Sequence, residues 1–145
     1  MPKPPHFFQA YPFSCVPACL RMVLAKFGIE KTEPELRSLC GCDETGTTVS
    51  KAIKAVEKCG LKAYKSNLVL DDLKNLMLQD LNPIVYLRIS ENIKYSHSAV
   101  IYEITNEKVF VLDPEIGERE FDINFFIEIW SRGLTIIIES KIKQR

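Results

Sequence analysis

The spacing of apolar residues changes at Leu61, and this change limits the chain to one class of fold. Before it, residues 14–28, 32–40 and 47–60 carry apolar side chains three or four positions apart, the period of an amphipathic helix. After it, short runs rich in Val and Ile predict strands at residues 61–65, 83–89, 96–104, 108–113, 118–122 and 134–140, with further helices at 70–79 and 123–130. Helices that precede antiparallel strands indicate an α+β domain rather than alternating βαβ units.

Residues with known preferences for helix ends support these boundaries. Ser14 is a candidate cap for the first helix, and Gly28 stands where a left-handed residue ends it. Thr32 and Glu35 have the spacing of a capping box, and Gly60 follows the third helix. The predicted helices of the first half of the chain therefore begin and end at residues typical of helix ends.

Length and composition favour a single domain covering residues 1–145. The 19 Lys and Arg residues balance the 19 Asp and Glu residues without a long run of either sign, so we expect no nucleic-acid partner. No apolar run approaches the roughly 20 residues of a membrane span, and no signal peptide follows Met1. We therefore expect a cytoplasmic protein without a membrane span. Five cysteines, an odd number, then predict reduced thiols rather than a disulfide framework.

One of these thiols has the position of a nucleophile. Cys15 precedes the apolar stripe of the first helix and lies in its first turn, where unpaired N–H groups and the helix dipole favour a thiolate. Cys19 and Cys59 are interpreted as core residues. A nucleophilic thiol needs a base, and His97 is favoured because it lies on a predicted strand, whereas the segment around His6 is expected to be too loose.

The predicted hairpin supplies a third group. With a three-residue loop at residues 105–107, Ala99 pairs with Asp113, and His97 becomes its diagonal neighbour about 7–8 Å away. Asp113 would then orient the imidazole and stabilise its protonated form. Without His97, Asp113 would be interpreted simply as the start of a turn. Gln9, six residues before Cys15, offers an amide that could join the Cys15 N–H in an oxyanion hole.

These residues and their surroundings resemble a known family. Gln9, Cys15 and the "ACLRM" helix, followed by "GTTVSKAIKAVEKCGLKA", "NPIVYL", "HSAVIYEI", "VLDPEIGE" and a late Phe-x-x-x-Trp-x-x-Gly, are similar to the double-glycine leader peptidases. These are papain-like cysteine peptidases often found as N-terminal domains of bacteriocin and peptide exporters, and the resemblance covers residues 9–138. It implies a papain-like fold in which an N-terminal helical half carrying the nucleophile packs on a C-terminal antiparallel sheet.

The resemblance also implies the roles of the site residues. Cys15 would be the nucleophile, His97 the general base and acid, Asp113 the orienting carboxylate and Gln9 the oxyanion donor. The implied reaction is cleavage of a leader peptide after two small residues, commonly Gly-Gly or Gly-Ala, through an acyl-enzyme. The partners would be a peptide or protein substrate with a leader segment and an ABC exporter acting in trans, and we expect no cofactor and no metal.

The chain departs from the family where it carries Ser14-Cys15-Val16 in place of Asp-Cys-Gly. We expect the branched side chain of Val16 to tighten the channel beside the thiol.

Three other interpretations stay open from the sequence. Cys15, Cys19, Cys40 and Cys42 could form a structural zinc module, although their spacing is a poor match to the usual paired ligands. A peptide-binding domain could recognise a leader without cutting it. An acyl transferase or cyclase could use the same acyl-enzyme with an amine acceptor.

Overall fold

The helices that precede Leu61 form as the sequence predicts in a computed structural model that describes residues 3–89 and 97–142. They are α1 (Cys15–Lys26), α2 (Glu33–Cys40) and α3 (Val49–Lys58). The capping box of α2 is confirmed, because Thr32 Oγ1 accepts the Glu35 N–H while the Glu35 carboxylate accepts the Thr32 N–H. Caps of this kind depend only on neighbouring residues, so the sequence alone predicts them.

Ser14 is the N-cap residue of α1, as predicted, and its carbonyl accepts the Ala18 N–H, but its side chain does not form the expected cap. The Ser14 side chain makes no hydrogen bond to the first turn of α1. Its hydroxyl instead donates to the Tyr11 carbonyl at 3.0 Å and lies 3.3 Å from Glu33 Oε1, on a neighbouring helix. Glu33 also accepts the Ala10 N–H at 2.8 Å. A long-range contact has thus replaced the local cap and holds the loop before Cys15 against α2.

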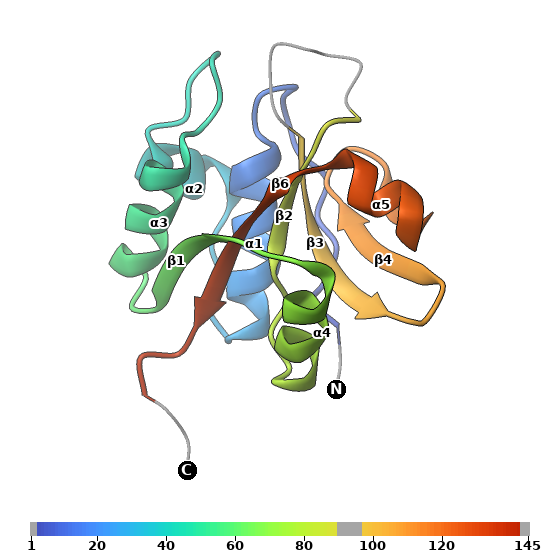
Figure 1. Ribbon diagram of the computed structural model, residues 1–145. Coiled ribbons are helices and arrows are strands. Elements are labelled where there is room, and N and C mark those ends of the chain that lie inside the picture. The colour runs from blue at the N-terminus through green and yellow to red at the C-terminus, as the bar shows by residue number, and fades with distance from the viewer. Residues whose placement is uncertain (1–2, 90–96, 143–145) are drawn as a thin grey trace.

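The strands form a single antiparallel sheet (Figure 1). Within the described residues it has six strands in the order β1-β6-β2-β3-β4-β5. Their bounds are β1 (Lys62–Asn67), β2 (Ile84–Leu87), β3 (His97–Ile104), β4 (Lys108–Asp113), β5 (Gly117–Asp122) and β6 (Trp130–Glu139). The helices α4 (Leu70–Leu78) and α5 (Ile123–Ile129) also lie where the sequence predicts them. Ser96, the first residue of the predicted strand 96–104, lies outside the described residues.

Apolar side chains fill both faces of this sheet. On one face Ile84, Val100 and Ile136 belong to a buried cluster that includes residues of α1, α2 and α3. On the other face Val85, Ala99 and Ile137 pack in a second cluster with residues of α4 and α5. The alternation along each strand follows the two-residue period of a pleated strand. The α+β class is confirmed, and the helical half that carries Cys15 packs on the sheet as predicted.

The β3–β4 hairpin differs from the predicted one in two places that compensate. Thr105 donates its N–H to the Lys108 carbonyl at 2.9 Å, so the turn has two central residues and not the three predicted. The shorter turn alone would move the pairing by one residue. A register shift between Ile101 and Glu103 reverses this change, so that Val100 faces Leu112 as predicted. Without this bulge, Asp113 would lie on the face of the sheet opposite to His97.

The structure explains why the last residue of the Phe-x-x-x-Trp-x-x-Gly motif, Gly133, is a glycine. Its φ angle is +69°, and a Cβ atom there would lie 2.1 Å from the Leu68 carbonyl oxygen. The same backbone accepts the Leu68 N–H at 2.9 Å, which joins β6 to the end of β1. Only glycine fits such a close approach.

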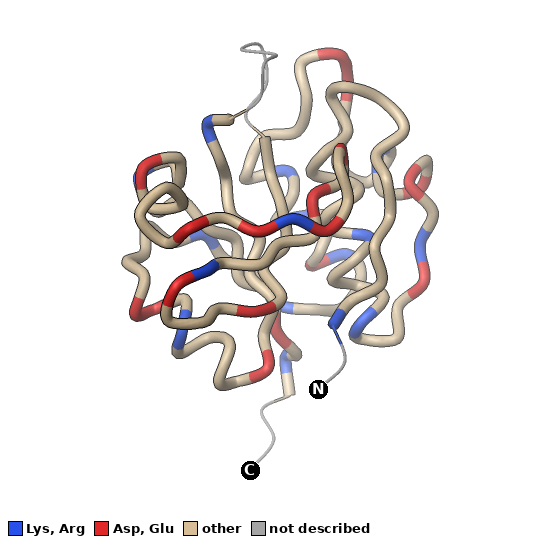
Figure 2. Tube along the Cα trace, turned by 90° about the vertical axis from the view of Figure 1, so that its right-hand side faces the viewer, with Lys and Arg blue, Asp and Glu red and all other residues tan. Residues whose placement is uncertain are grey.

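Acidic and basic residues of the described chain are scattered along the backbone in both signs (Figure 2). None of its helices is long and apolar enough to cross a bilayer.

Candidate active site

The carboxylate of Asp113 is the most densely bonded group of the site. Asp113 is the last residue of β4 and is fully buried. Its Oδ1 accepts hydrogen bonds from His97 Nε2 at 2.8 Å and from the N–H groups of Glu115 and Ile116 at 2.8 and 3.3 Å. Burial alone would raise the pKa of this carboxyl, but the His97 bond, its charge and the other donors hold it below the usual value. Asp113 is therefore a carboxylate held in one orientation.

The imidazole of His97 connects this carboxylate to the thiol. His97 is the first residue of β3, and its side chain is hydrogen-bonded to both Asp113 and Cys15. Because Nε2 is occupied by Asp113, Nδ1 is the nitrogen that faces the sulfur. Burial lowers the pKa of His97, but the bonds to Asp113 and Cys15 outweigh it and raise this pKa to about 9.

The thiol of Cys15 lies where the helical half meets the sheet. Cys15 is the first residue of α1, and only 5% of it is exposed. Contacts between α1 and β3 bring the two halves together at this point. The structure thus joins Cys15, His97 and Asp113 in one hydrogen-bonded chain, although they come from three separate elements.

Gln9, the predicted oxyanion donor, forms hydrogen bonds to two backbone carbonyl groups. Its Nε2 donates to the Tyr11 carbonyl at 2.8 Å, and its Oε1 is buried without a hydrogen-bond partner in the described part of the chain. Its backbone N–H donates to the Pro114 carbonyl at 2.8 Å. The backbone of Gln9 is therefore tied to the turn that follows Asp113, and its side chain to the Tyr11 carbonyl.

The expectation that the segment around His6 is too loose is wrong. His6 Nε2 hydrogen-bonds the Asp113 carbonyl oxygen at 2.7 Å, and the Arg21 guanidinium stacks 3.8 Å from the centre of the Phe7 ring. Lys3 pairs with Glu118. These contacts are long-range, so no local pattern predicts them, and they fasten the N-terminal segment beside Asp113.

Arg119 and Glu115 are residues of the site that sequence reasoning missed. Arg119 Nη1 lies 3.2 Å from Asp113 Oδ2, the oxygen that His97 does not use. Glu115 Oε2 lies 3.9 Å from His97 Nδ1. Asp113 pairs with Gly117 across the β4–β5 turn, which puts Arg119 two residues further along the same face. A predicted register for that turn could have found Arg119.

A pocket of about 280 Å³ adjoins the thiol. It is lined by Phe13, Cys15, Val16, residues 45–49, Tyr86 and Leu134. Val16 is buried and forms part of its wall. Because most of the lining is apolar or hydroxylic, the pocket suits a short uncharged part of a ligand.

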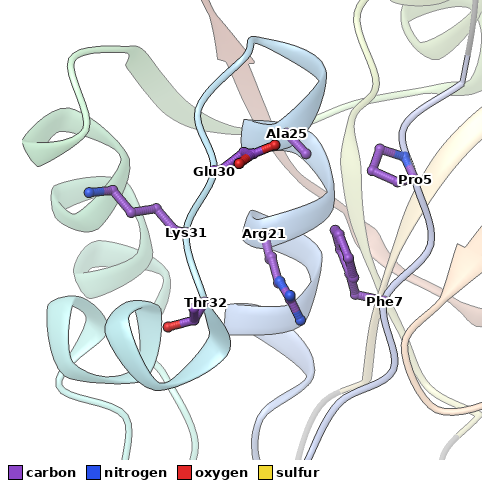
Figure 3. A pocket seen from close by; sticks show the side chains of 7 residues that line it. All are labelled: Pro5, Phe7, Arg21, Ala25, Glu30, Lys31 and Thr32. Carbon is purple, nitrogen blue, oxygen red and sulfur yellow. The ribbon is translucent and has the colours of Figure 1, made fainter.

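A larger pocket, of about 670 Å³, lies elsewhere and includes none of the four predicted site residues. Figure 3 shows Pro5 and Phe7 on one side of it, Arg21 and Ala25 from α1, and residues 30–32 from the segment that leads into α2. Size alone therefore does not identify the site.

The other thiols do not assemble around Cys15 as metal ligands. None of the five cysteines forms a disulfide. Residues 3–89 and 97–142 contain no group of three or more His, Cys, Asp or Glu residues that could hold a metal ion. Cys19 Sγ instead lies 3.5 Å from Ser98 Oγ, and Cys42 Sγ donates to the Phe13 carbonyl. The zinc alternative thus lacks a ligand cluster in the part of the chain that the structure describes.

A cysteine, a histidine and a carboxylate or carboxamide joined in this order form the constellation of papain-like cysteine peptidases. The α+β architecture is also found in solved peptidase domains. The peptidase domain of Streptococcus ComA, a bifunctional ABC transporter, matches with a TM-score of 0.81 and 22% identity over 94% of this chain and 98% of that domain. A double glycine motif protease from an AMS/PCAT transporter, solved with a leader peptide, has a TM-score of 0.83 and 21% identity over 96% and 93% of the two chains.

Sequence comparison specifies the family. The model of the Peptidase C39 family matches residues 4–143. An uncharacterized protein of Methanothermobacter thermautotrophicus is 31% identical over 129 residues, 89% of this chain and 84% of that protein. The lactococcin-G-processing and transport ATP-binding protein LagD of Lactococcus lactis subsp. lactis is 32% identical over 119 residues, 81% of this chain but 16% of LagD. The chain belongs to the Peptidase C39 family and is a cysteine peptidase, and it spans about a sixth of LagD.

The bonds of His97 predict how it titrates. We expect its imidazole to lose its proton near pH 9, and Cys15→Ala to lower that pKa because one of the bonds that raise it is removed. A raised pKa stabilises the fold fully below pH 6.5, and the stabilisation is lost as the pH rises through 9. NMR of labelled histidine, with His6→Gln for assignment, measures the titration. A pKa at or below 6.5 for His97 would contradict the bonding described above.

Proposed function

We propose that residues 1–145 form one peptidase domain that cleaves a leader peptide after a pair of small residues. The observation that carries this proposal is the hydrogen-bonded position of His97 between Cys15 and Asp113. LagD is named as a lactococcin-G-processing and transport ATP-binding protein. For this chain we propose a substrate with a leader segment and an ABC exporter that acts in trans, in the cytoplasm, where a reducing environment keeps a nucleophilic thiol active.

The proposed chemistry uses the four predicted residues. Below its pKa of about 9, His97 already holds on Nδ1 the proton that the thiol gives up, and the Cys15 sulfur attacks the carbonyl carbon of the scissile bond. The tetrahedral intermediate then expels the amine, which receives that proton from His97, and a thioester with Cys15 is left. His97 next removes a proton from water, whose oxygen attacks the thioester and releases the acid. Asp113 keeps the ring oriented and stabilises its charge throughout.

Gln9 serves as oxyanion donor in this proposal, together with the Cys15 N–H. A carboxamide nitrogen carries two N–H groups, and the bond to the Tyr11 carbonyl uses only one of them. The bonds of Gln9 to Tyr11 and Pro114 hold its backbone and side chain before substrate arrives. Such preorganised donors stabilise the transition state without further rearrangement.

The pocket beside the thiol supports selection of small residues. Val16 and Leu134 narrow the space next to Cys15, and the whole pocket is about 280 Å³. A pair of glycines passes such a space without a steric penalty, whereas a branched side chain must displace the wall. An apolar helical segment upstream of the cleavage point would supply the binding energy that two glycines lack.

Peptide cleavage tests this proposal directly. For synthetic leader peptides, we expect replacement of the first of the two small residues by Leu to lower kcat/KM at least tenfold, about 1.4 kcal/mol. Val16→Gly should reduce that penalty because it widens the wall, whereas Val69→Gly, at an exposed position that does not line the pocket, should not. Mass spectrometry of the products gives the cleavage point. A preference for bulky residues at both positions would refute the double-glycine assignment and leave the broader papain-like chemistry.

A further inference from the structure

Glu115 places a carboxylate at the open side of the site. Its backbone is fixed, because its N–H donates to Asp113 Oδ1 at 2.8 Å. Its side chain is 57% exposed, and Oε2 lies 3.9 Å from His97 Nδ1. The carboxylate is thus held near the reacting nitrogen by its backbone while its oxygens stay accessible to a substrate.

The charge of Glu115 is not neutralised by a lysine or arginine in the described residues, where its one ion contact is with His97. The neighbouring cations are otherwise engaged. Arg119 pairs with Asp113, and Lys3 pairs with Glu118. A cationic group that arrives with the substrate would therefore find an available partner.

The direction of the reaction decides which part of the substrate meets this carboxylate. Nε2 of His97 is bonded to Asp113, so the proton for the leaving amine must come from Nδ1. The residues that follow the scissile bond consequently lie over Nδ1, on the side of Glu115. The pocket lined by Val16, Val49 and Leu134 does not include Glu115 and is left for the acyl side.

We infer that Glu115 is a specificity-determining residue that favours a lysine or arginine among the first two residues after the scissile bond. This inference rests on the proposed function and adds the charge of the released segment to it. Since the side chain is exposed, solvent screens the interaction, and the effect should be modest and decrease with added salt.

Charge-matched peptides test this inference. The peptides share a leader and a Gly-Gly pair and carry Lys, Gln or Glu at both positions after the bond. At low ionic strength we expect the wild-type protein to cleave the Lys peptide about fivefold faster, in kcat/KM, than the Glu peptide. The ratio should approach one in Glu115→Gln and fall below one in Glu115→Lys. Glu57→Lys, an exposed change of the same charge on α3, should keep the wild-type ratio.

The outcomes separate the two proposals. Cleavage after Gly-Gly with equal rates for all three peptides, or a ratio unchanged in Glu115→Lys, would overturn the role of Glu115 and leave the proposed function intact. Absence of cleavage of any of these peptides by the wild-type protein would overturn both.

Discussion

Cys15→Ala removes peptide cleavage, with an expected loss in kcat of at least about a thousandfold, because no other group can form the thioester. The fold should persist. Cys15 is only 5% exposed, but replacing its sulfur by hydrogen empties a small volume at the edge of the core, at an expected cost of about 1 kcal/mol. Mass spectrometry measures the cleavage, and urea denaturation measures the free energy of unfolding.

The matched control for this variant is Cys42→Ala. Cys42 is a half-buried thiol that donates to the Phe13 carbonyl and has no part in the proposed chemistry, so this variant should keep its activity. If Cys15→Ala still cut the peptide at the same bond, the nucleophile would be another residue. If the wild-type protein bound a leader peptide without cutting it, the silent peptide-binding alternative would be correct.

Asp113→Asn should lower kcat/KM at least about a hundredfold, although an asparagine serves in related constellations. The reason is local to this chain. Asp113 accepts four hydrogen bonds on two oxygens, and asparagine has only one oxygen. If that oxygen stays on His97 and the turn N–H groups, the amide nitrogen must face the Arg119 guanidinium, which also can only donate. The variant should also lower the pKa of His97 from about 9, because a charged partner is lost.

The double variant Asp113→Asn with Arg119→Gln tests this explanation. A glutamine oxygen can accept from the asparagine amide, so we expect the double variant to recover about tenfold in kcat/KM over Asp113→Asn alone. Lys108→Gln, which removes a cation that pairs with Asp122 on the same sheet, should bring no recovery when combined with Asp113→Asn. Additive losses at Asp113 and Arg119 would show that the ion pair has no part in orienting the site.

The contact between Arg119 and Asp113 also explains how a buried carboxylate persists beside a strand end. A carboxylate without partners is costly to bury, and breaking a buried pair leaves an uncompensated charge. Here the donors come from β3, from the turn after β4 and from β5, so the same contacts that hold Asp113 ionised also fasten those elements together. Stability and the proposed catalytic geometry thus depend on one cluster.

Much of the helical half follows from sequence because its determinants are local. The capping box joins Thr32 and Glu35, which are three positions apart, and Gly60 takes its positive φ directly after α3. The sequence also predicts the position of Cys15 before the apolar stripe and that of His97 near the start of a strand. The family resemblance, which the Peptidase C39 match confirms, adds the roles expected of these residues.

The pairing of His97 with Asp113 is an intermediate case. The sequence predicted it through a three-residue loop, whereas the chain has a two-residue turn and a bulge between Ile101 and Glu103. Two errors of one residue cancel, and the parity that puts both side chains on one face is preserved. Turn length and bulges depend on packing against neighbouring strands, so a single hairpin sequence does not determine them.

Contacts between distant parts of the chain were decided by the tertiary structure alone. Ser14 turns from its expected cap to Glu33, His6 reaches the Asp113 carbonyl 107 positions away, and Arg119 reaches Asp113 only through the β4–β5 register. Helix periodicity and helix caps depend on residues a few positions apart, which compete for the same backbone hydrogen bonds, so they can be predicted from the sequence. The partners of a buried carboxylate are instead chosen by which segments the whole fold brings to one point, and no local pattern records that choice.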